Sequence, residues 1–223
     1  MLMPHPWNLS VPEATALQRA LAAQVVEAPL PAPPRFVAGA DISFDKYAPV
    51  LHAAFVVLDA ESGEVVDRRG VQAPVGFPYV PGYLSFREVP PLLDAWAGLR
   101  VRPDLIICDG HGRAHPRRLG LACHLGLWLD RPTLGCGKSR LCGTFAEPGA
   151  ERGDFSPLVD RDEVIGQVLR TRRGVKPVFV SVGHRITLDE ARAQVLRLSK
   201  WRLPETTRQA HAEVNRLRRG ARS

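Results

Sequence analysis

The sequence predicts an α/β fold with a mixed central sheet, an antiparallel meander on one side, parallel strands on the other, and helices on both faces. The prediction rests on the order of the elements. Strand-like segments come first, a helix follows them, and short apolar strands then alternate with helices. That order is typical of a sheet covered by helices on both faces. The chain has 223 residues, so we expect a single domain over residues 1–223, with its core at about 8–212.

A capped helix is expected at the start of the chain, from Ser10 to about Glu27. Ser10 can cap this helix, and the carboxylate of Glu13 can reach back to the Ser10 backbone, which makes a capping box. Four prolines between Pro29 and Pro34 then exclude helix and stiffen the connection to the sheet.

The antiparallel meander is expected from three segments rich in β-branched and aromatic residues. They are Phe36–Phe44, His52–Asp59 and Val65–Val71. Glu61–Glu64 between the last two has the composition of a hairpin turn.

A second helix is expected from Ser85, after a loop rich in proline and glycine at Ala73–Leu84. Its apolar residues recur three and four apart, which indicates a helix with one buried face. They are Leu92, Leu93, Trp96 and Leu99.

Short apolar strands alternate with helices in the second half of the chain. Strands that are buried on both faces are apolar throughout, so these runs suit the parallel part of a sheet. The expected strands are Leu105–Asp109, Thr133–Cys136 and Val178–Val182, and the expected helices are Leu119–Leu129, Thr187–Lys200 and Pro204–Arg218. The basic tail Arg216–Arg222 is expected to fray. The ribonuclease-H-like fold has this order of elements.

The charge of the chain favours a polyanionic partner. Its net charge is +7 and its isoelectric point is about 9.7, and an excess of Lys and Arg neutralises phosphates. A generally basic proteome explains the charge equally well. No apolar run approaches the ~20 residues that span a bilayer, so we expect no membrane partner.

Cysteine usage and the N-terminal residues predict a cytoplasmic protein. The four cysteines, Cys108, Cys123, Cys136 and Cys142, lack the spacing of a zinc site, so we expect reduced thiols. Met1–Ser10 has neither the charged nor the apolar region of a signal peptide.

Two aspartates occupy positions where a metal site is plausible. Asp41 is set among small and apolar residues, and a lone buried carboxylate is costly unless it is paired or bound to a metal. Asp109 ends an apolar strand, and ligands of α/β sheets gather at the carboxyl ends of strands. Two such acids on neighbouring strands suit magnesium. The alternatives are a paired acid at Asp41 and a turn acid before glycine at Asp109.

Glu88 is ambiguous when the residues are considered alone. It follows Ser85 by three residues, so a capping box at the start of the second helix explains it without a metal. The residues alone favour that helix cap.

The densest polar stretch of the chain is the loop from Gly110 to Arg118. Its two glycines, two histidines and three arginines suit a loop that approaches phosphates or bases, and a solvated basic loop is the alternative. Lys138 follows a strand of small residues and could offset charge on a phosphoryl group, unless it is an ordinary surface lysine. His184 and His211 are single histidines, which are more often structural.

The loop Phe77–Leu84 holds an aromatic residue between two prolines. A stiff loop with an exposed aromatic tip is what some proteins insert between bases. A proline loop that packs on the core explains the pattern equally well.

Taken together, these motifs resemble the endonuclease V family from about Leu17 to His211. The matching segments are Val37–Asp41, Pro78–Glu88, Pro103–Asp104 through Asp109–Gly112, Ala114–Gly120, Gly137–Lys138, Arg140–Gly143, Gly183–Arg185 and Arg202–Arg208. Several long motifs in the right order make the resemblance specific. Val80 stands where the family's loop usually has Ile, which keeps its shape.

The resemblance implies the ribonuclease-H-like fold and a magnesium-dependent endonuclease, with Mn²⁺ as an alternative cofactor. It implies that Asp41 and Asp109 bind the metal, with Glu88 completing the acidic site directly or through water. It also implies that Lys138 lies near the scissile phosphate and that His211 positions the attacking water.

The resemblance further implies how the substrate is held. Tyr79 would head a wedge that fills the gap left by a rotated base, and the lesion pocket would be largely backbone. The residues expected to contact nucleic acid are Pro78, Tyr79, Val80, Pro81, Gly82, Leu84, Gly110, Gly112, His115 and Gly120. Family members cut the second phosphodiester bond on the 3′ side of deoxyinosine in DNA and leave a 3′-hydroxyl and a 5′-phosphate.

Two other functions remain open at the level of sequence. One is an endonuclease for inosine in RNA, because a 2′-hydroxyl contact decides between the nucleic acids. The other is a nucleic-acid-binding module without catalysis, against which the intact set Asp41, Glu88, Asp109 and Lys138 argues. We expect the protein to act as a monomer.

Overall fold

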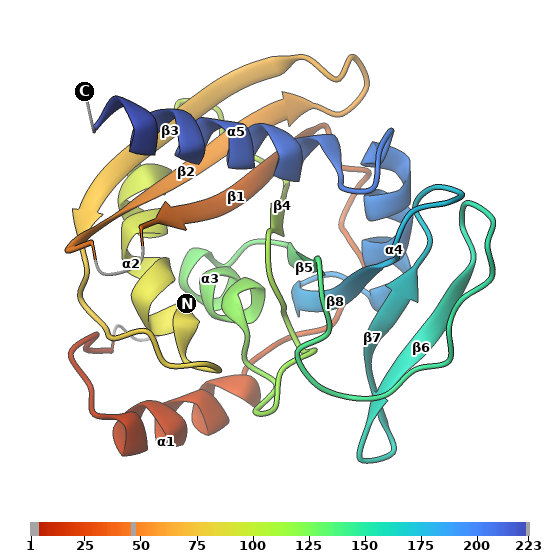
Figure 1. The fold of residues 1–223 in the computed structure, drawn as a ribbon, viewed down its shortest axis with the longest axis horizontal. Helices are drawn as coiled ribbons and strands as arrows, with labels where there is room; N and C mark the ends of the chain where they lie inside the picture. The colour runs from red at the N-terminus through yellow and green to blue at the C-terminus, as the bar shows by residue number, and fades with distance from the viewer. Residues whose placement is uncertain (1–4, 46–47, 222–223) are drawn as a thin grey trace.

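A computed structural model describes residues 5–45 and 48–221 (Figure 1). In this part of the chain, an eight-stranded mixed sheet has the order β3-β2-β1-β4-β5-β8-β7-β6. The strands are β1 (Phe36–Phe44), β2 (Val50–Asp59), β3 (Val65–Pro74), β4 (Leu105–Cys108), β5 (Thr133–Gly137), β6 (Phe155–Asp160), β7 (Glu163–Leu169) and β8 (Val178–His184). The helices are α1 (Val11–Ala22), α2 (Leu84–Ala97), α3 (Leu121–Leu129), α4 (Leu188–Leu198) and α5 (Glu205–Gly220).

The predicted meander is confirmed at one side of the sheet. Strand β2 pairs antiparallel with both β1 and β3. The turn between β2 and β3 contains Gly63 at a φ of 75°, a conformation that glycine adopts at no steric cost. The meander places β1 in the middle of the sheet, where β4 pairs with its other edge in parallel.

The other side of the sheet differs from the prediction. Strands β1, β4 and β5 run parallel, but β8 pairs antiparallel with β5, and β7 and β6 extend the sheet antiparallel beyond it. Strand β8 is buried along its whole length, as a parallel strand would be. An apolar run therefore reports burial and carries no information about strand direction.

Strands β6 and β7 form a hairpin that was not predicted. Its turn is made by Arg161 and Asp162 at φ values of 54° and 64°, without the glycine that usually marks such turns. Pro157 lies within β6, which is the edge strand of the sheet, where a missing backbone N–H is tolerated.

Helices cover both faces of the sheet, as predicted. On one face, Leu92 of α2 and Leu125 of α3 pack with Phe55 and Ile106 of the sheet. On the other face, Val195 of α4 joins the strand residues of a second core cluster, and α5 lies along β1 and β2 (Figure 1). Two apolar layers therefore hold β1 and β4 rigidly between helices.

Several helix boundaries differ from the prediction for local reasons. Helix α1 ends at Ala22 and not near Glu27, because the Val26 backbone N–H donates to Nδ1 of His184 at 3.2 Å and its carbonyl accepts from Arg185 at 2.7 Å. Helix α3 begins at Leu121, two residues later than expected. The capping boxes expected at Ser10 and Thr187 are both present.

The C-terminal tail is more ordered than predicted. Helix α5 continues to Gly220, so residues 216–220 are helical where fraying was expected, while Arg222 lies outside the described residues.

The four cysteines form no disulfide, and three of them are buried. In the described part of the chain, no helix is long and apolar enough to cross a membrane.

Candidate active site

Two predicted acids meet at the carboxyl ends of β1 and β4. Asp41 lies near the end of β1 with 6% of its surface exposed. Asp109 directly follows β4, and its backbone N–H donates to the Ala40 carbonyl at 3.0 Å. The parallel pairing of these two strands brings the carboxylates together, as the strand-end argument predicted.

Helix α5 adds a histidine to this pair. Nδ1 of His211 lies 2.8 Å from Oδ2 of Asp41, and the other Asp41 oxygen accepts the Ile42 backbone N–H at 2.8 Å. Ligand atoms of Asp41, Asp109 and His211 all lie within 4.8 Å of one another. The prediction that His211 belongs to the site is thereby consistent with its position, although sequence alone made it a weak candidate.

A glycine in β1 allows α5 to approach this closely. A Cβ atom on Gly39 would lie 2.0 Å from the carbonyl oxygen of Thr206, so only glycine leaves room for the first turn of the helix. His211 is about one and a half turns further along α5. The contact at Gly39 therefore sets the distance between His211 and Asp41.

The electrostatics of the acids fit a divalent cation. Burial, and then repulsion by Asp109, raise the pKa of Asp41 to about 6. Burial, and then repulsion by Asp41, raise the pKa of Glu88 to about 8. Carboxylates that are desolvated and repel one another are stabilised by a hard cation, and their oxygens are the ligands that magnesium prefers.

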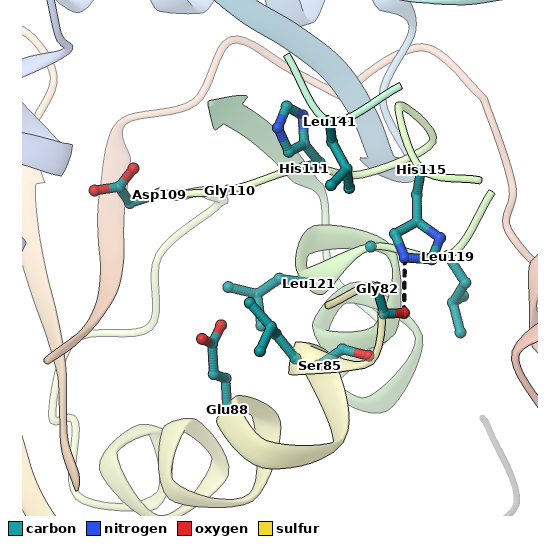
Figure 2. Close-up of a pocket in the computed structure, with 12 residues that line it drawn as sticks. Gly82, Ser85, Glu88, Asp109, Gly110, His111, His115, Leu119, Leu121 and Leu141 are labelled. Carbon is teal, nitrogen blue, oxygen red and sulfur yellow. Dashed lines mark hydrogen bonds between the residues drawn. The ribbon is translucent and has the colours of Figure 1, made fainter. Parts of the chain in front are cut away.

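The helix-cap interpretation of Glu88 is wrong. Helix α2 begins at Leu84 after Tyr83, and no side chain caps it. Ser85, the expected cap, bonds through its Oγ to Nδ1 of His124 at 3.0 Å. Glu88 lines a cavity together with Asp109 (Figure 2), so it stays a predicted member of the acidic site.

Lys138 lies beside the acids, and its backbone is held by Arg202, for which no role was predicted. Nζ of Lys138 contacts Oδ2 of Asp109 at 2.5 Å, although the side chain is 39% exposed, and its role at a phosphoryl group stays a prediction. The guanidinium of Arg202 donates to the Lys138 carbonyl at 2.6 Å and to the Pro177 carbonyl at 3.1 Å. Arg202 thereby positions the backbone that carries Lys138. Arg202 begins the segment Arg202–Arg208 that resembles the family, and this resemblance could have identified it from sequence.

A cavity of about 180 Å³ adjoins the acids, and glycines, leucines and two histidines make up much of its lining. In Figure 2, Ser85 and Glu88 lie on one side of it, and His111 and His115 lie opposite. Predicted residues that line it are Gly82, Leu84, Gly110, His115 and Gly120, and residues that the sequence analysis missed are Ser85, His111, Leu119, Leu121 and Leu141.

Gly112 is not among the residues that line this cavity, and its contact with nucleic acid stays a prediction. A Cβ atom there would lie 1.9 Å from the Val182 carbonyl oxygen, and its N–H donates to Ser181 Oγ at 2.8 Å. Gly112 is glycine because the loop packs tightly on β8. The pair of glycines in the sequence could not show which of them meets the cavity.

His115 forms a neutral wall of the cavity. It is 3% exposed, its Nδ1 accepts the Arg117 N–H at 3.1 Å, and its Nε2 therefore donates to the Gly82 carbonyl at 3.0 Å (Figure 2). Burial, and then the charge of Arg117, lower the pKa of His115 to about 4. The same carbonyl accepts from Arg117 Nη2 at 2.6 Å, which ties the Gly82 turn to the basic loop.

Two other arginines of the basic loop face protein groups. Glu163 of the missed hairpin accepts from Arg113 at 2.7 Å and from Arg118 at 2.6 Å. The solvated-loop interpretation is therefore wrong for these two arginines. His184, the other single histidine, is 3% exposed and bonded to the Val26 backbone, as a structural residue would be.

The proline loop has an exposed tip over a buried anchor. Tyr79 is 59% exposed, with its ring centroid 6.0 Å from that of Phe44, and the flanking Pro78 and Pro81 are also exposed. Phe77 is 2% exposed and packs on Phe86. Val80 and Tyr83 also pack on the cluster around Phe77, so the packed-loop alternative holds for this part of the loop. Insertion of Tyr79 between bases stays a prediction.

Comparisons with known proteins agree on one family. The family model described as Endonuclease V matches residues 19–212. The endonuclease V of Gloeobacter violaceus is 51% identical, and the alignment covers 96% of this chain and 89% of the relative. The crystal structure of the endonuclease V of Streptomyces avermitilis is 45% identical, with a TM-score of 0.93 and coverage of 99% and 98%.

A more distant structure carries a nucleic acid. The Ciona intestinalis endonuclease V, in complex with a 24mer DNA containing an inosine followed by a ribo-adenosine, is 25% identical. Its TM-score is 0.84, and the match covers 95% of this chain and 98% of that one. The ribonuclease-H-like fold is thereby confirmed, and the chain belongs to the endonuclease V family.

Proposed function

We propose that this protein is a magnesium-dependent endonuclease that acts on deoxyinosine in DNA. It hydrolyses the second phosphodiester bond 3′ of the lesion and leaves a 3′-hydroxyl and a 5′-phosphate. The observation that carries the proposal is the position of the acids. Asp109 and Glu88 line the cavity that would take the base, and Asp109 groups with Asp41 and His211. The inosine-containing DNA in the Ciona intestinalis relative supports the same substrate.

Each side chain of the site would have its own role in hydrolysis. Asp41 and Asp109, which lie together at the strand ends, would hold a divalent cation, with Glu88 completing the acidic site directly or through water. Bound there, Mg²⁺ would polarise the phosphate and lower the pKa of the attacking water, and Mn²⁺ could replace it. Lys138, now paired with Asp109, would offset charge that develops on the scissile phosphate. Because Nδ1 of His211 bonds to Asp41, its Nε2 stays available to position the attacking water.

The cavity and the proline loop would recognise the lesion. The base is rotated out of the helix, at a cost of a few kcal/mol that is lower in a mispair. Backbone groups of Gly82, Gly110 and Gly120 then meet its edge, and Tyr79 fills the gap that it leaves. We further propose that the protein acts as a monomer in the cytoplasm, in the repair of deaminated DNA.

A strand-cleavage assay tests the proposal. DNA strands that differ only in one inosine are incubated with the protein, with and without Mg²⁺, and the ends are mapped to one nucleotide. We expect a metal-dependent cut at the second bond 3′ of inosine and an intact control strand. A protein that binds the inosine strand in Mg²⁺ or Mn²⁺ without cutting it would instead support the non-catalytic module.

Inosine in RNA is the second candidate substrate. It is favoured by the ribo-adenosine that follows inosine in the DNA of the Ciona intestinalis complex. A 2′-hydroxyl beside the cut distinguishes the two nucleic acids. Matched RNA strands in the same assay decide between them, because a ribonuclease cuts the RNA strand faster and the proposed deoxyribonuclease does not.

A further inference from the structure

A chain of hydrogen bonds connects the N-terminal residues to the cavity. Nδ1 of His124 lies 3.0 Å from Ser85 Oγ, and its Nε2 lies 2.9 Å from Nε2 of His5. That same His5 nitrogen accepts the indole N–H of Trp128 at 3.0 Å. Nδ1 of His5 lies 3.0 Å from the Pro6 carbonyl. Ser85 lines the cavity (Figure 2), while His5 precedes the residues that the family model matches.

The partners determine where each proton lies. A carbonyl can only accept, so His5 carries a proton on Nδ1. The Trp128 indole can only donate, so His5 Nε2 has a lone pair there. His124 must then be the donor between the two Nε2 atoms.

His124 is fully buried, and burial lowers its pKa well below the usual value. It is therefore neutral, with its proton on Nε2 and a lone pair on Nδ1. The hydroxyl proton of Ser85 consequently points at His124.

Ser85 is left as an oriented acceptor at the cavity. A serine hydroxyl has one proton and two lone pairs, and His124 uses the proton. Within the described part of the chain, no donor binds Ser85 Oγ. The side chain is 4% exposed at the start of α2, so its rotation is restricted by packing. Its remaining lone pairs can bind an N–H group in the cavity.

From this geometry we infer that Ser85 is a specificity-determining residue for the base, and that His124 and His5 are positioning residues that set its polarity. The inference rests on the proposed function. Hypoxanthine carries a proton on N1 and would donate to Ser85 Oγ. Adenine has a lone pair on N1, so two acceptors would face each other. A buried acceptor without a donor is costly, and such mismatches give strong discrimination.

An aromatic cluster surrounds the hydrogen-bonded chain of Ser85, His124 and His5, which we call the relay, and keeps it rigid. The Trp7 ring stacks on Trp128 with centroids 5.1 Å apart, and Phe86 meets His124 edge-on at 5.1 Å. Packing and hydrogen bonding are separable here, because Trp7 contributes ring contacts alone. Trp7→Phe is therefore a packing control that leaves every bond of the relay in place.

Substrate discrimination is the first test. The kcat/KM values for strands with inosine, adenosine and unsubstituted purine are compared, since the last two have no N1 proton. For Ser85→Ala we expect kcat/KM on inosine to fall about tenfold, with little change for the other two bases. His5→Ala should lower the ratio of kcat/KM on inosine to kcat/KM on adenosine by a smaller factor. Trp7→Phe should leave this ratio unchanged. A merely structural role would lower all three rates together.

The His124 tautomer is the second test, and it needs no substrate. Nitrogen NMR of the unaltered protein should show the proton of His124 on Nε2, and His5→Ala should mix the tautomers. A proton on Nδ1 of His124 in the unaltered protein overturns the inference. An unchanged ratio of kcat/KM on inosine to kcat/KM on adenosine in Ser85→Ala also overturns it. Failure of the unaltered protein to cut inosine strands at all would instead refute the proposed function, and with it the inference.

Discussion

At the scale of single residues, burial decides what the titratable groups can do. Asp41 and Glu88 carry pKa values raised to about 6 and about 8, because both are desolvated and each is near other carboxylates. His115 has the opposite shift for the same reason, since burial always disfavours the charged form. The acids are thus held in an arrangement that costs stability and suits a cation.

The Asp41→Asn variant should separate stability from activity. The amide has almost the same shape and removes a desolvated charge beside Asp109, so we expect the metal-free variant to melt no lower than the unaltered protein. Cutting of the inosine strand should fall at least about a hundredfold, because a ligand oxygen loses its charge. Calorimetry and a cleavage assay measure the two effects, and Asp45→Asn is the control. Near-normal cutting would remove Asp41 from the site.

His115 should make stability depend on pH in acid. Its folded pKa of about 4 is below the ordinary 6.5, so below pH 6.5 the unfolded chain binds the proton more readily. Its stabilising contribution is complete above pH 6.5 and is lost as the pH falls towards 4. By linkage, the loss is about 2 kcal/mol at pH 5. Urea unfolding at pH 7 and pH 5 measures it, and His115→Gln should show a smaller decline. Equal declines would exclude His115 as the cause.

At the scale of elements, close backbone contacts decide where the helices place their side chains. Helix α5 reaches Asp41 only because Gly39 lets the Thr206 carbonyl approach β1. The start of α2 carries Ser85 and Glu88 into the cavity, and the loop before it leaves Tyr79 exposed.

The Gly39→Ala variant should displace α5. Its Cβ would lie 2.0 Å from a carbonyl that belongs to the helix backbone, so the helix must move and His211 with it. We expect a loss of about 1–3 kcal/mol in unfolding free energy and a larger proportional loss of cutting. Gly76→Ala is the control, because nothing lies within 4 Å of a Cβ there. An unchanged melting temperature would contradict the expected clash.

The Tyr79→Ala variant tests the wedge. Because this side chain is 59% exposed, its removal should leave the melting temperature within about 2 °C of the original. The preference for inosine over adenine strands should fall, since the gap beside the rotated base is no longer filled. Competition between the two duplexes measures it, and Val164→Ala, another exposed apolar residue, is the control. An unchanged preference would refute the wedge.

At the scale of the whole molecule, charge and topology act together. The mixed sheet brings Asp41 and Asp109 together at the carboxyl ends of β1 and β4, and the net charge of +7 favours a polyanionic partner for the molecule as a whole. Charge contributes affinity for any strand, and the cavity contributes discrimination between bases.

Binding to nucleic acid should therefore depend on salt. Raising the salt concentration from about 50 mM to about 200 mM should weaken binding of a lesion-free duplex about a hundredfold, as counterion release at about four phosphate contacts predicts. Fluorescence anisotropy measures it with the metal omitted. The ratio of inosine to control affinity should change much less, because cavity contacts release no counterions. A salt-independent affinity would mean that phosphates are not the main contact.

The meander, both capping boxes and the family could be predicted from the amino-acid sequence, because these depend on neighbours along the chain or on whole motifs. Side-chain types also placed Asp41 and Asp109 at strand ends. The direction of β8 could not be predicted, since an apolar strand looks the same in either direction, and its pairing with β5 fixes it. The tertiary structure also decided the role of Glu88, whose spacing from Ser85 imitated a helix cap. The polarity of Ser85 depends on His5 and His124, which are distant in sequence and come together only when the N-terminal residues pack on α3.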